Sequence, residues 1–424
     1  MSSLKKYIKL FLNRHQGLRK IARKTYTSLR EKRYESRTGG IEVDEKLVLF
    51  ETFMGRQYGC NPRAIYEQML ADDRFADYRF AWALNEPERA KEFPELERAE
   101  VVPLLSDRYF ELCAAAGHII TNSNLDYGIV KRPGQTFVQT WHGTPLKRLR
   151  CDITAESGNI NNSLEEIRTK NDGDVVRYDY FLSPSRFASE KFRSAFRMDA
   201  LGISDIIAET GYPRNDILYN YTETQAEEIR RSLGIPDGRK IILYAPTFRD
   251  NKYNGEAYVY DLHLNFDRLR EVLGDEYVVL FRAHYFVAKQ FDFAAYEGFA
   301  YDVSELDDIS PLYLISDMLI TDYSSVFFDY ANLKRPMLFY MYDLDEYADD
   351  IRGFYIDISE LPGPVVRSED ELMELLDGMK KETGSDDYFS RFGQAYEEFN
   401  GKYNYLDDGS ASKRVIDLVF DKGE

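Results

Sequence analysis

The sequence predicts an α/β protein made of two doubly wound domains, each built on a parallel sheet. A single basic helix is expected at the N-terminus, before the first domain. Short apolar runs rich in β-branched and aromatic residues alternate with helical stretches through most of the 424 residues. The alternation comes in two consecutive sets, and strands joined by helices form parallel sheets covered on both faces. Two consecutive units of this size suggest domains that face one another across a cleft.

The first set of elements extends from about residue 45 to residue 216. Its strands are expected at 46–53, 78–84, 118–122, 137–141, 178–182 and 206–210. Its helices are expected at 61–70, 87–97, 106–116 and 185–196. Asn61 is a plausible N-cap for the first of these helices, and Pro62 suits its first turn.

The second set follows a turn at Pro236-Asp237-Gly238. Its strands are expected at 240–245, 277–282, 300–303, 317–321 and 336–342, with helices at 223–233, 265–273, 311–316 and 323–333. Polar helices are expected at 369–382, 387–399 and 409–420. We therefore predict a basic segment over 1–40, an N-terminal domain over 41–220, a C-terminal domain over 221–400 and a C-terminal helix over 401–424.

The composition is that of a globular protein in a reducing compartment. The chain is 44% hydrophobic and 14% aromatic, which excludes disorder throughout. Its three cysteines show neither a disulfide framework nor the spacing of a zinc site. No apolar stretch is long enough to span a membrane, and the N-terminus does not resemble a signal peptide, so we expect a cytoplasmic protein.

Positive charge is concentrated at the N-terminus. Residues 1–33 contain eleven Lys or Arg and one acid, a net +10, and because the whole chain carries −18 the rest carries −28. Leu4, Ile8, Phe11 and Leu12 share one helical face, and Leu18, Ile21 and Ala22 extend the stripe. This pattern predicts contact with an anionic membrane surface. A solvated tail or a helix packed on the body are the alternatives, and the acidic body argues against nucleic acid as a partner.

One stretch, Phe137-Val138-Gln139-Thr140-Trp141-His142-Gly143-Thr144-Pro145, places a histidine where a buried strand gives way to a loop. Gly and Pro end the strand, and ligands bind at strand ends in open α/β sheets. The structural alternative is that His142 is buried in the core with its ring nitrogens hydrogen-bonded.

Polar residues also follow three strands of the second set. These are Pro246-Thr247-Phe248-Arg249, Arg282-Ala283-His284 and Thr321-Asp322-Tyr323-Ser324-Ser325. In a parallel sheet these carboxyl ends lie on one edge. Arginine guanidinium groups and a helix N-terminus at that edge could donate hydrogen bonds to the oxygens of a diphosphate. Plain N-capping is the alternative for the serines. Asp329, one turn beyond Ser325, is either a ligand contact or a solvated helix acid.

Several common motifs are missing from the sequence. There is no G-x-G-x-x-G after the first strand, no G-x-x-x-x-G-K-[ST] and no G-x-S-x-G, which disfavours dinucleotide oxidoreductases, P-loop NTPases and α/β-hydrolases. The five histidines show no H-E-x-x-H and no close pairing, so we predict no metal site built by the protein.

Five motifs in order give a specific resemblance. They are Trp141-His142-Gly143-Thr144-Pro145-Leu146-Lys147, Gly211-Tyr212-Pro213-Arg214-Asn215-Asp216, Ala245-Pro246-Thr247-Phe248-Arg249, Arg282-Ala283-His284 and Thr321-Asp322-Tyr323-Ser324-Ser325. Together they resemble the CDP-glycerol glycerophosphotransferase family, the bacterial teichoic acid polymerases and primases. The resemblance covers about residues 45–400 and implies a GT-B fold of two Rossmann-like domains, the first for the acceptor and the second for CDP-glycerol.

The resemblance also implies an activity and a site. Glycerol phosphate, or a related polyol phosphate, would pass from CDP-glycerol to a hydroxyl of a lipid-linked or glycan acceptor at the inner membrane face, and CMP would leave. By its place in the motif, His142 corresponds to the catalytic base of the family. His284 would be a second catalytic residue, which stabilises charge on the diphosphate. The donor site would include Trp141, Gly143, Thr144, Pro145, Arg214, Pro246, Thr247, Arg282, Ser324, Ser325 and Asp329. Arg249 is added from its place at a strand end. No cofactor is implied, and Mg²⁺ remains an open possibility.

Two other functions stay open at this point. A GT-B glycosyltransferase that uses a nucleotide sugar would have the same fold. A catalytically silent scaffold of cell-envelope assembly would bind nucleotide without turnover.

Overall fold

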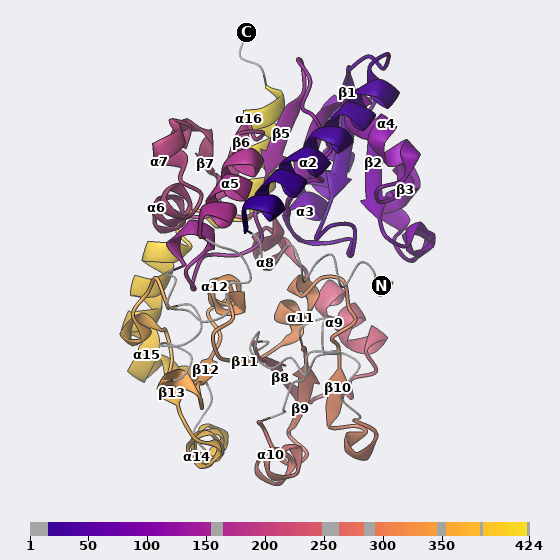
Figure 1. Ribbon diagram of the computed structural model, residues 1–424. Helices are drawn as coiled ribbons and strands as arrows, with labels where there is room; N and C mark the ends of the chain where they lie inside the picture. Colours follow the sequence, from indigo (N-terminus) through magenta and orange to yellow (C-terminus); the bar gives the residue numbers. More distant parts are fainter. Residues whose placement is uncertain are drawn as a thin grey trace. The chain divides into compact units, whose positions relative to one another are not determined.

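The computed structural model describes residues 16–153, 164–247, 263–283, 293–345, 353–381 and 385–421 (Figure 1). The chain divides into two compact units, each made of separate segments. The first comprises Met1–Tyr58, Met69–Trp141 and Asn162–Phe181, and the second comprises Gly59–Gln68, His142–Asn161 and Leu182–Glu424. Because these segments interleave along the sequence, the predicted consecutive domain boundaries stay predictions.

A seven-stranded sheet has the order β3-β2-β1-β4-β5-β6-β7. The strands are β1 (Asp44–Glu51), β2 (Arg79–Leu84), β3 (Ala99–Pro103), β4 (Ala116–Thr121), β5 (Thr136–Gln139), β6 (Tyr180–Ser183) and β7 (Ile207–Glu209). The pairs from β3 to β6 run parallel, and Leu49 of β1 lies opposite Ala81 of β2 and Ile119 of β4. Apolar residues fill both faces of β1 and β4, as expected for a parallel sheet that is covered on both sides.

Helices of this part of the chain are α2 (Gln16–Thr38), α3 (Cys60–Leu70), α4 (Asp107–Ala115), α5 (Leu164–Val175), α6 (Arg186–Ala195) and α7 (Met198–Leu201). The C-terminal part of α2, drawn in indigo in Figure 1, packs on the first unit. Tyr34 is buried with its ring edge against Phe110 of α4, and Arg30 forms an ion pair with Asp126 at 2.7 Å. The predicted basic N-terminal helix, expected within residues 1–40, is therefore confirmed over Gln16–Thr38, whereas the stripe at residues 4–12 lies outside the described residues.

A six-stranded sheet has the order β10-β9-β8-β11-β12-β13, and all its pairs run parallel. Its strands are β8 (Lys240–Ala245), β9 (Tyr277–Phe281), β10 (Ala300–Asp302), β11 (Met318–Thr321), β12 (Met337–Tyr340) and β13 (Val365–Val366). The helices are α8 (Ile217–Asn220), α9 (Glu223–Ser232), α10 (Phe266–Leu273), α11 (Ser310–Ile315), α12 (Val326–Tyr330), α14 (Glu369–Lys381), α15 (Ser385–Tyr403) and α16 (Ala411–Phe420).

The predicted fold class, an α/β chain with two parallel sheets, is confirmed. Two local predictions are wrong, and one strand was missed. The stretch 87–97 forms two short 3-10 helices, Pro87–Glu92 and Pro94–Arg98, because Pro94 has no N–H to continue a helix. The edge strand β3 was not predicted, since its alternating half-exposed pattern ends in a proline. The expected helix 323–333 is shorter: α12 has five residues and a 3-10 turn, Ala331–Leu333, follows it.

Candidate functional site

Three neighbouring strands of the second sheet bring the predicted residues to one edge. β8 pairs with both β9 and β11, and all three run parallel. Their carboxyl ends therefore lie together, with Pro246 and Thr247 after β8, Arg282 after β9, and Ser324 and Ser325 after β11. The predicted gathering of these strand ends is confirmed, while the role of each side chain stays a prediction.

Asp322 ties two of these strand ends to one another. It is buried, and its Oδ1 accepts hydrogen bonds from the main-chain N–H of Thr247 at 2.8 Å and of Tyr323 at 2.6 Å. The hydroxyl of the preceding residue, Thr321, donates to the carbonyl of Ala245 at 2.7 Å. The polar residues Thr321 and Asp322 therefore hold the start of the loop after β8, and Asp322 has a structural role that the sequence analysis did not assign.

The Arg282 guanidinium is hydrogen-bonded to the loop that follows β10. Its two terminal nitrogens donate to the carbonyls of Val303 and Leu306, each at 2.8 Å. Burial lowers the pKa of Arg282, and the Asp308 carboxylate acts in the opposite sense. Arg282 thus fixes the loop after β10 and keeps its positive charge close to the sheet edge.

The two serines open a short helix. The Ser324 hydroxyl accepts a hydrogen bond from the N–H of Val326 at 3.5 Å, and Ser325 occupies the N-cap position of α12 in a helical conformation. A helix of five residues has a weak dipole, so α12 as a whole contributes little to the predicted anion site.

In the loop that begins at Trp141, the exposure of the side chains changes from one residue to the next. Trp141 is buried in the first unit, where its ring stacks on Phe181 with centroids 6.0 Å apart. Its φ of 52° is a left-handed conformation, which is costly for a bulky residue and marks a constrained turn. The next residue, His142, has an exposed side chain, whereas Thr144 and Pro145 are buried. The alternative of a core histidine is therefore excluded for His142.

After the turn, main-chain hydrogen bonds join residues 146–148 to another segment of the second unit. Lys147 forms an antiparallel bridge with Phe354, the N–H of Arg148 donates to the carbonyl of Gly353 at 3.1 Å, and that of Tyr355 donates to the carbonyl of Leu146 at 2.8 Å. A Cβ added to Gly143 would lie 2.8 Å from the Ser325 hydroxyl oxygen, so a larger residue at 143 would require displacement of Ser325. Gly143 thus lies next to the start of α12.

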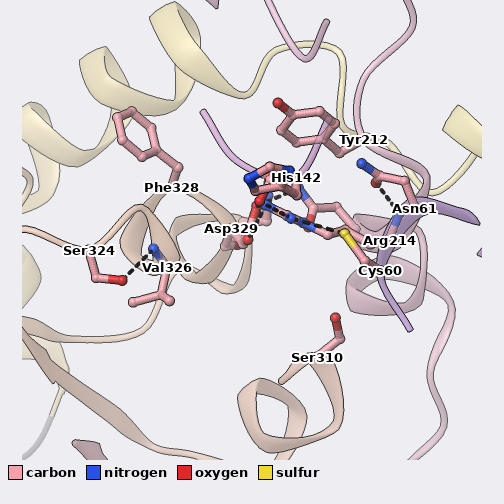
Figure 2. Close-up of polar contacts among 12 residues, drawn as sticks. Cys60, Asn61, His142, Tyr212, Arg214, Ser310, Ser324, Val326, Phe328 and Asp329 are labelled. Atoms are coloured by element: carbon pink, nitrogen blue, oxygen red, sulfur yellow. Dashed lines mark hydrogen bonds and ion pairs between the residues drawn. The ribbon is translucent and has the colours of Figure 1, made fainter. Parts of the chain in front are cut away.

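A buried polar network surrounds Arg214 (Figure 2). Its guanidinium binds both carboxylate oxygens of Asp329, at 2.7 and 3.0 Å, and donates to the main-chain carbonyl of His142 at 2.7 Å and to the sulfur of Cys60 at 3.4 Å. The main-chain N–H of Arg214 donates to the side-chain oxygen of Asn61 at 3.1 Å. Asn61 lies inside α3, so its predicted role as an N-cap is wrong.

Asn215 extends this network to the C-terminal part of the chain. Its amide donates to Asp329 at 3.2 Å and to Asp407 at 2.7 Å, and Asp407 also accepts from the N–H of Tyr212 at 3.0 Å. Burial raises the pKa of Asp407 to about 6, while these hydrogen bonds act to lower it. Sequence reasoning missed Cys60, Asn61 and Asp407, because nothing local distinguishes them from ordinary helix or loop residues.

Two predicted site residues, Arg249 and His284, lie outside the described residues. Within the described ranges no group of three or more His, Cys, Asp or Glu side chains is placed to hold a metal ion. None of the helices in these ranges is both long and apolar enough to span a membrane.

Comparison with known proteins gives consistent matches. Residues 34–421 match the protein family described as CDP-Glycerol:Poly(glycerophosphate) glycerophosphotransferase. The chain is 40% identical over 408 residues to a teichoic acid poly(glycerol phosphate) polymerase of Bacillus subtilis, covering 95% of this chain and 51% of that protein. It is 37% identical to a teichoic acid glycerol-phosphate transferase of Staphylococcus aureus, covering 89% of this chain and 93% of that protein.

A solved structure of the wall teichoic acid polymerase TagF, from a variant soaked with CDPG, superposes with a TM-score of 0.82 at 34% identity and covers 98% of both chains. The chain spans about half the length of the poly(glycerol phosphate) polymerases of Bacillus subtilis and Staphylococcus epidermidis that it matches.

Proposed function

The chain belongs to the CDP-glycerol:poly(glycerophosphate) glycerophosphotransferase family, and we propose that it transfers glycerol phosphate from CDP-glycerol to a hydroxyl of a lipid-linked or glycan acceptor in teichoic acid synthesis. The observation that carries this proposal is the match of residues 34–421 to that family, with relatives at 37–40% identity over most of the chain. The sheet edge at β8, β9 and β11 supports it, because Arg282, Ser324 and Ser325 follow the carboxyl ends of β9 and β11 there.

In the proposed reaction the acceptor hydroxyl oxygen attacks the β-phosphorus of CDP-glycerol. A new P–O bond forms as the bond from the β-phosphorus to the bridging oxygen breaks, and CMP leaves with the electron pair. His142 takes the hydroxyl proton, since the unperturbed pKa of imidazole lies near neutrality and the side chain is exposed. Phosphoryl transfer depends mainly on positioning and charge stabilisation, so no covalent intermediate is needed.

We assign the remaining predicted residues to the donor. Arg282 and His284 would stabilise charge on the diphosphate and on the departing CMP. The chain segments Trp141–Pro145 and Pro246–Thr247, together with Ser324 and Ser325, would surround CDP-glycerol, and Arg249 joins them by its place after β8. A comparison of turnover with and without a chelator tests whether the reaction requires Mg²⁺.

We also propose peripheral association with an anionic membrane surface on its cytoplasmic face. The part of α2 that precedes Arg30 presents Leu18, Ile21, Tyr26 and Leu29 to solvent, with 49–65% of each side chain exposed. Leu18, Ile21 and Leu29 share the helix face opposite the buried Tyr34, and the sequence around them is basic. An exposed apolar stripe with flanking Lys and Arg suits the interface of an anionic bilayer.

Incubation with CDP-glycerol, CDP-ribitol and UDP-sugars tests the function directly. Each donor is mixed with lipid-linked and glycan acceptors, released nucleotide is quantified, and products are identified by mass spectrometry. We expect acceptor-dependent release of CMP from CDP-glycerol and a product heavier by one glycerol phosphate. Turnover of a UDP-sugar alone would indicate a glycosyltransferase, and nucleotide binding without any turnover would indicate a scaffold; either result would overturn the proposal.

A further inference from the structure

The loop after β8 begins with a residue that cannot continue the sheet. Ala245 is the last residue of β8, and it pairs with Thr321 of β11. Pro246 follows, and because proline has no main-chain N–H it cannot donate to the neighbouring strand. The first main-chain N–H beyond the strand is therefore that of Thr247. The acceptor of this N–H helps to fix the direction in which the loop leaves the sheet.

That acceptor is the carboxylate of Asp322. Its Oδ1 accepts from the N–H of Thr247 at 2.8 Å and from the N–H of the next residue, Tyr323, at 2.6 Å. Only 2% of Asp322 is exposed. A buried carboxylate needs hydrogen-bond donors, so the loss of either bond is costly. Since one oxygen binds both N–H groups, Asp322 sets the separation between the start of the loop after β8 and the start of the loop after β11.

The loop after β11 is itself held in place. Tyr323 is buried, its hydroxyl donates to Asp343 at 3.1 Å, and its ring stacks on Phe354 with centroids 5.6 Å apart. Tyr323 lies between Asp322 and Ser324, so these contacts restrict the main chain that carries both residues. The Asp322 carboxylate is therefore a well-placed acceptor, and the loop after β8 is held against it.

We propose that Asp322 is a positioning residue for donor binding, which sets the place of the Pro246–Thr247 turn relative to Ser324. This inference rests on the proposed function, in which both loops surround CDP-glycerol. Asp322 need not touch the donor, since its effect passes through the N–H of Thr247. Binding groups act only when they are held in the right geometry, so movement of this turn should weaken donor binding and leave the acceptor unaffected.

The test uses the full chain and the variants Asp322→Ala and Asp322→Asn, with calorimetry for Kd and steady-state rates for KM. In Asp322→Ala we expect Kd and KM for CDP-glycerol to rise about 10-fold, while KM for the acceptor stays within about 2-fold of the wild-type value. Asp322→Asn retains an oxygen acceptor, but a neutral acceptor forms weaker hydrogen bonds, so the rise should be about 3-fold. A general defect in folding would not separate donor from acceptor in this way. If Asp322→Ala does not fold, Asp322→Asn carries the test.

Asp317 provides a matched control on the same two strands. It precedes β11, and its carboxylate accepts from the N–H of Ile241 at 2.7 Å, so it joins β11 to β8 at the ends opposite Asp322. Asp317→Ala and Asp317→Asn should lower the unfolding midpoint but keep Kd for CDP-glycerol within about 2-fold of the wild-type value. Wild-type Kd and KM in the Asp322 variants, or an equal loss of donor affinity in the Asp317 variants, would overturn the inference.

A second readout needs no ligand. Hydrogen exchange followed by mass spectrometry reports on the N–H of Thr247, because Pro246 adds no amide hydrogen to a peptide that spans both residues. We expect this N–H to exchange about 10-fold faster in Asp322→Ala than in the wild type, while that of Leu243, inside β8, stays protected. Unchanged exchange at Thr247 would refute the role of Asp322 whether or not the protein uses CDP-glycerol. Faster exchange in the variant, combined with a wild type that does not bind CDP-glycerol, would instead refute the proposed function.

Discussion

His142 combines a hydrogen-bonded main-chain carbonyl with an exposed side chain, an arrangement that suits the base role proposed for it. The carbonyl accepts from Arg214, and the ring remains accessible to a substrate hydroxyl. A histidine buried on a sheet face, such as His118 on β4, has no such access. The base role proposed for His142 therefore depends on the place of the residue after β5 and not only on its being a histidine.

We predict that His142→Ala lowers transfer about 10²–10⁴-fold, the usual contribution of a general base, and leaves the fold intact because the side chain is exposed. CMP release and calorimetric binding of CDP-glycerol measure the two effects separately. Binding should stay close to that of the wild type. Transfer at the wild-type rate in this variant would rule out His142 as the base.

Arg282 offers a second prediction, since its guanidinium already binds the carbonyls of Val303 and Leu306. Arg282→Ala should weaken binding of CDP-glycerol, and it should also destabilise the protein by about 1–3 kcal/mol because two carbonyls lose their donor. His284→Ala should weaken donor binding or slow transfer. Calorimetry, steady-state rates and urea unfolding measure these effects.

The partly exposed Arg268 of α10 serves as the control, since it pairs with Glu369 and Asp370 away from the carboxyl ends of the strands, and Arg268→Ala should leave donor binding unchanged. Donor affinity and rates equal to those of the wild type in the Arg282 and His284 variants would remove both residues from the donor site.

At the scale of elements, α2 has two different halves. Its C-terminal half is anchored by Tyr34 and by the ion pair of Arg30 with Asp126, whereas its N-terminal half exposes apolar side chains. Deletion of residues 1–33, the obvious test of membrane binding, would therefore also remove a contact that holds the helix to the first unit. Surface substitutions on the exposed stripe are the cleaner experiment.

We predict that the triple variant Leu18→Ser, Ile21→Ser and Leu29→Ser binds vesicles of phosphatidylglycerol more weakly than the wild type in a sedimentation assay. The residues are exposed, so unfolding should change little. Binding of the wild type should fall as salt rises, because each basic residue near an anionic surface contributes about 1 kcal/mol and salt screens it. The exposed Leu418 of α16 is the control, as Leu418→Ser should bind like the wild type. Equal sedimentation of the triple variant would show that α2 is not the anchor.

At the scale of the whole molecule, buried carboxyl groups make stability depend on pH. Burial raises the pKa of Glu51, at the end of β1, to about 7, although the hydroxyl of Tyr109 donates to it at 2.6 Å. Burial likewise raises the pKa of Asp407 in the second unit to about 6. A raised folded-state pKa means that the folded protein retains the proton longer than the unfolded chain does, so stability falls as pH rises toward these values and levels off above them.

We predict that Glu51→Gln abolishes part of this dependence. Between about pH 4.5 and pH 7 the wild type should lose roughly 3 kcal/mol through Glu51 alone, and the variant, which keeps an oxygen for the Tyr109 hydroxyl, should not. Urea unfolding at pH 4.5 and pH 8 measures this: the two proteins should be similar at the lower pH, and the variant should be more stable at the higher. The exposed Glu86→Gln is the control, and equal pH dependence of all three proteins would contradict the prediction.

The sequence by itself determined the fold class and the edge on which the predicted site lies. Alternating apolar strands and helices imply parallel sheets, and a parallel sheet places all carboxyl ends together, so Thr247, Arg282 and Ser324 were predicted to meet without knowledge of any long-range contact. The pattern failed where local signals are weak, as at the short edge strand β3 and at the 3-10 helices beside Pro87 and Pro94.

Only the tertiary structure determined the hydrogen-bond partners of the polar residues around Arg214. Arg214 and Asp329 are separated by 115 positions, and Arg214 and His142 by 72, so no periodicity relates them. The motif around Arg214 marked it as a candidate for the donor, yet its guanidinium is bound to a carboxylate, a carbonyl and a thiol. The physical reason is that hydrophobic patterning specifies which faces are buried, whereas the partner of a buried charge is set by packing, which alone determines the few polar groups within hydrogen-bond reach.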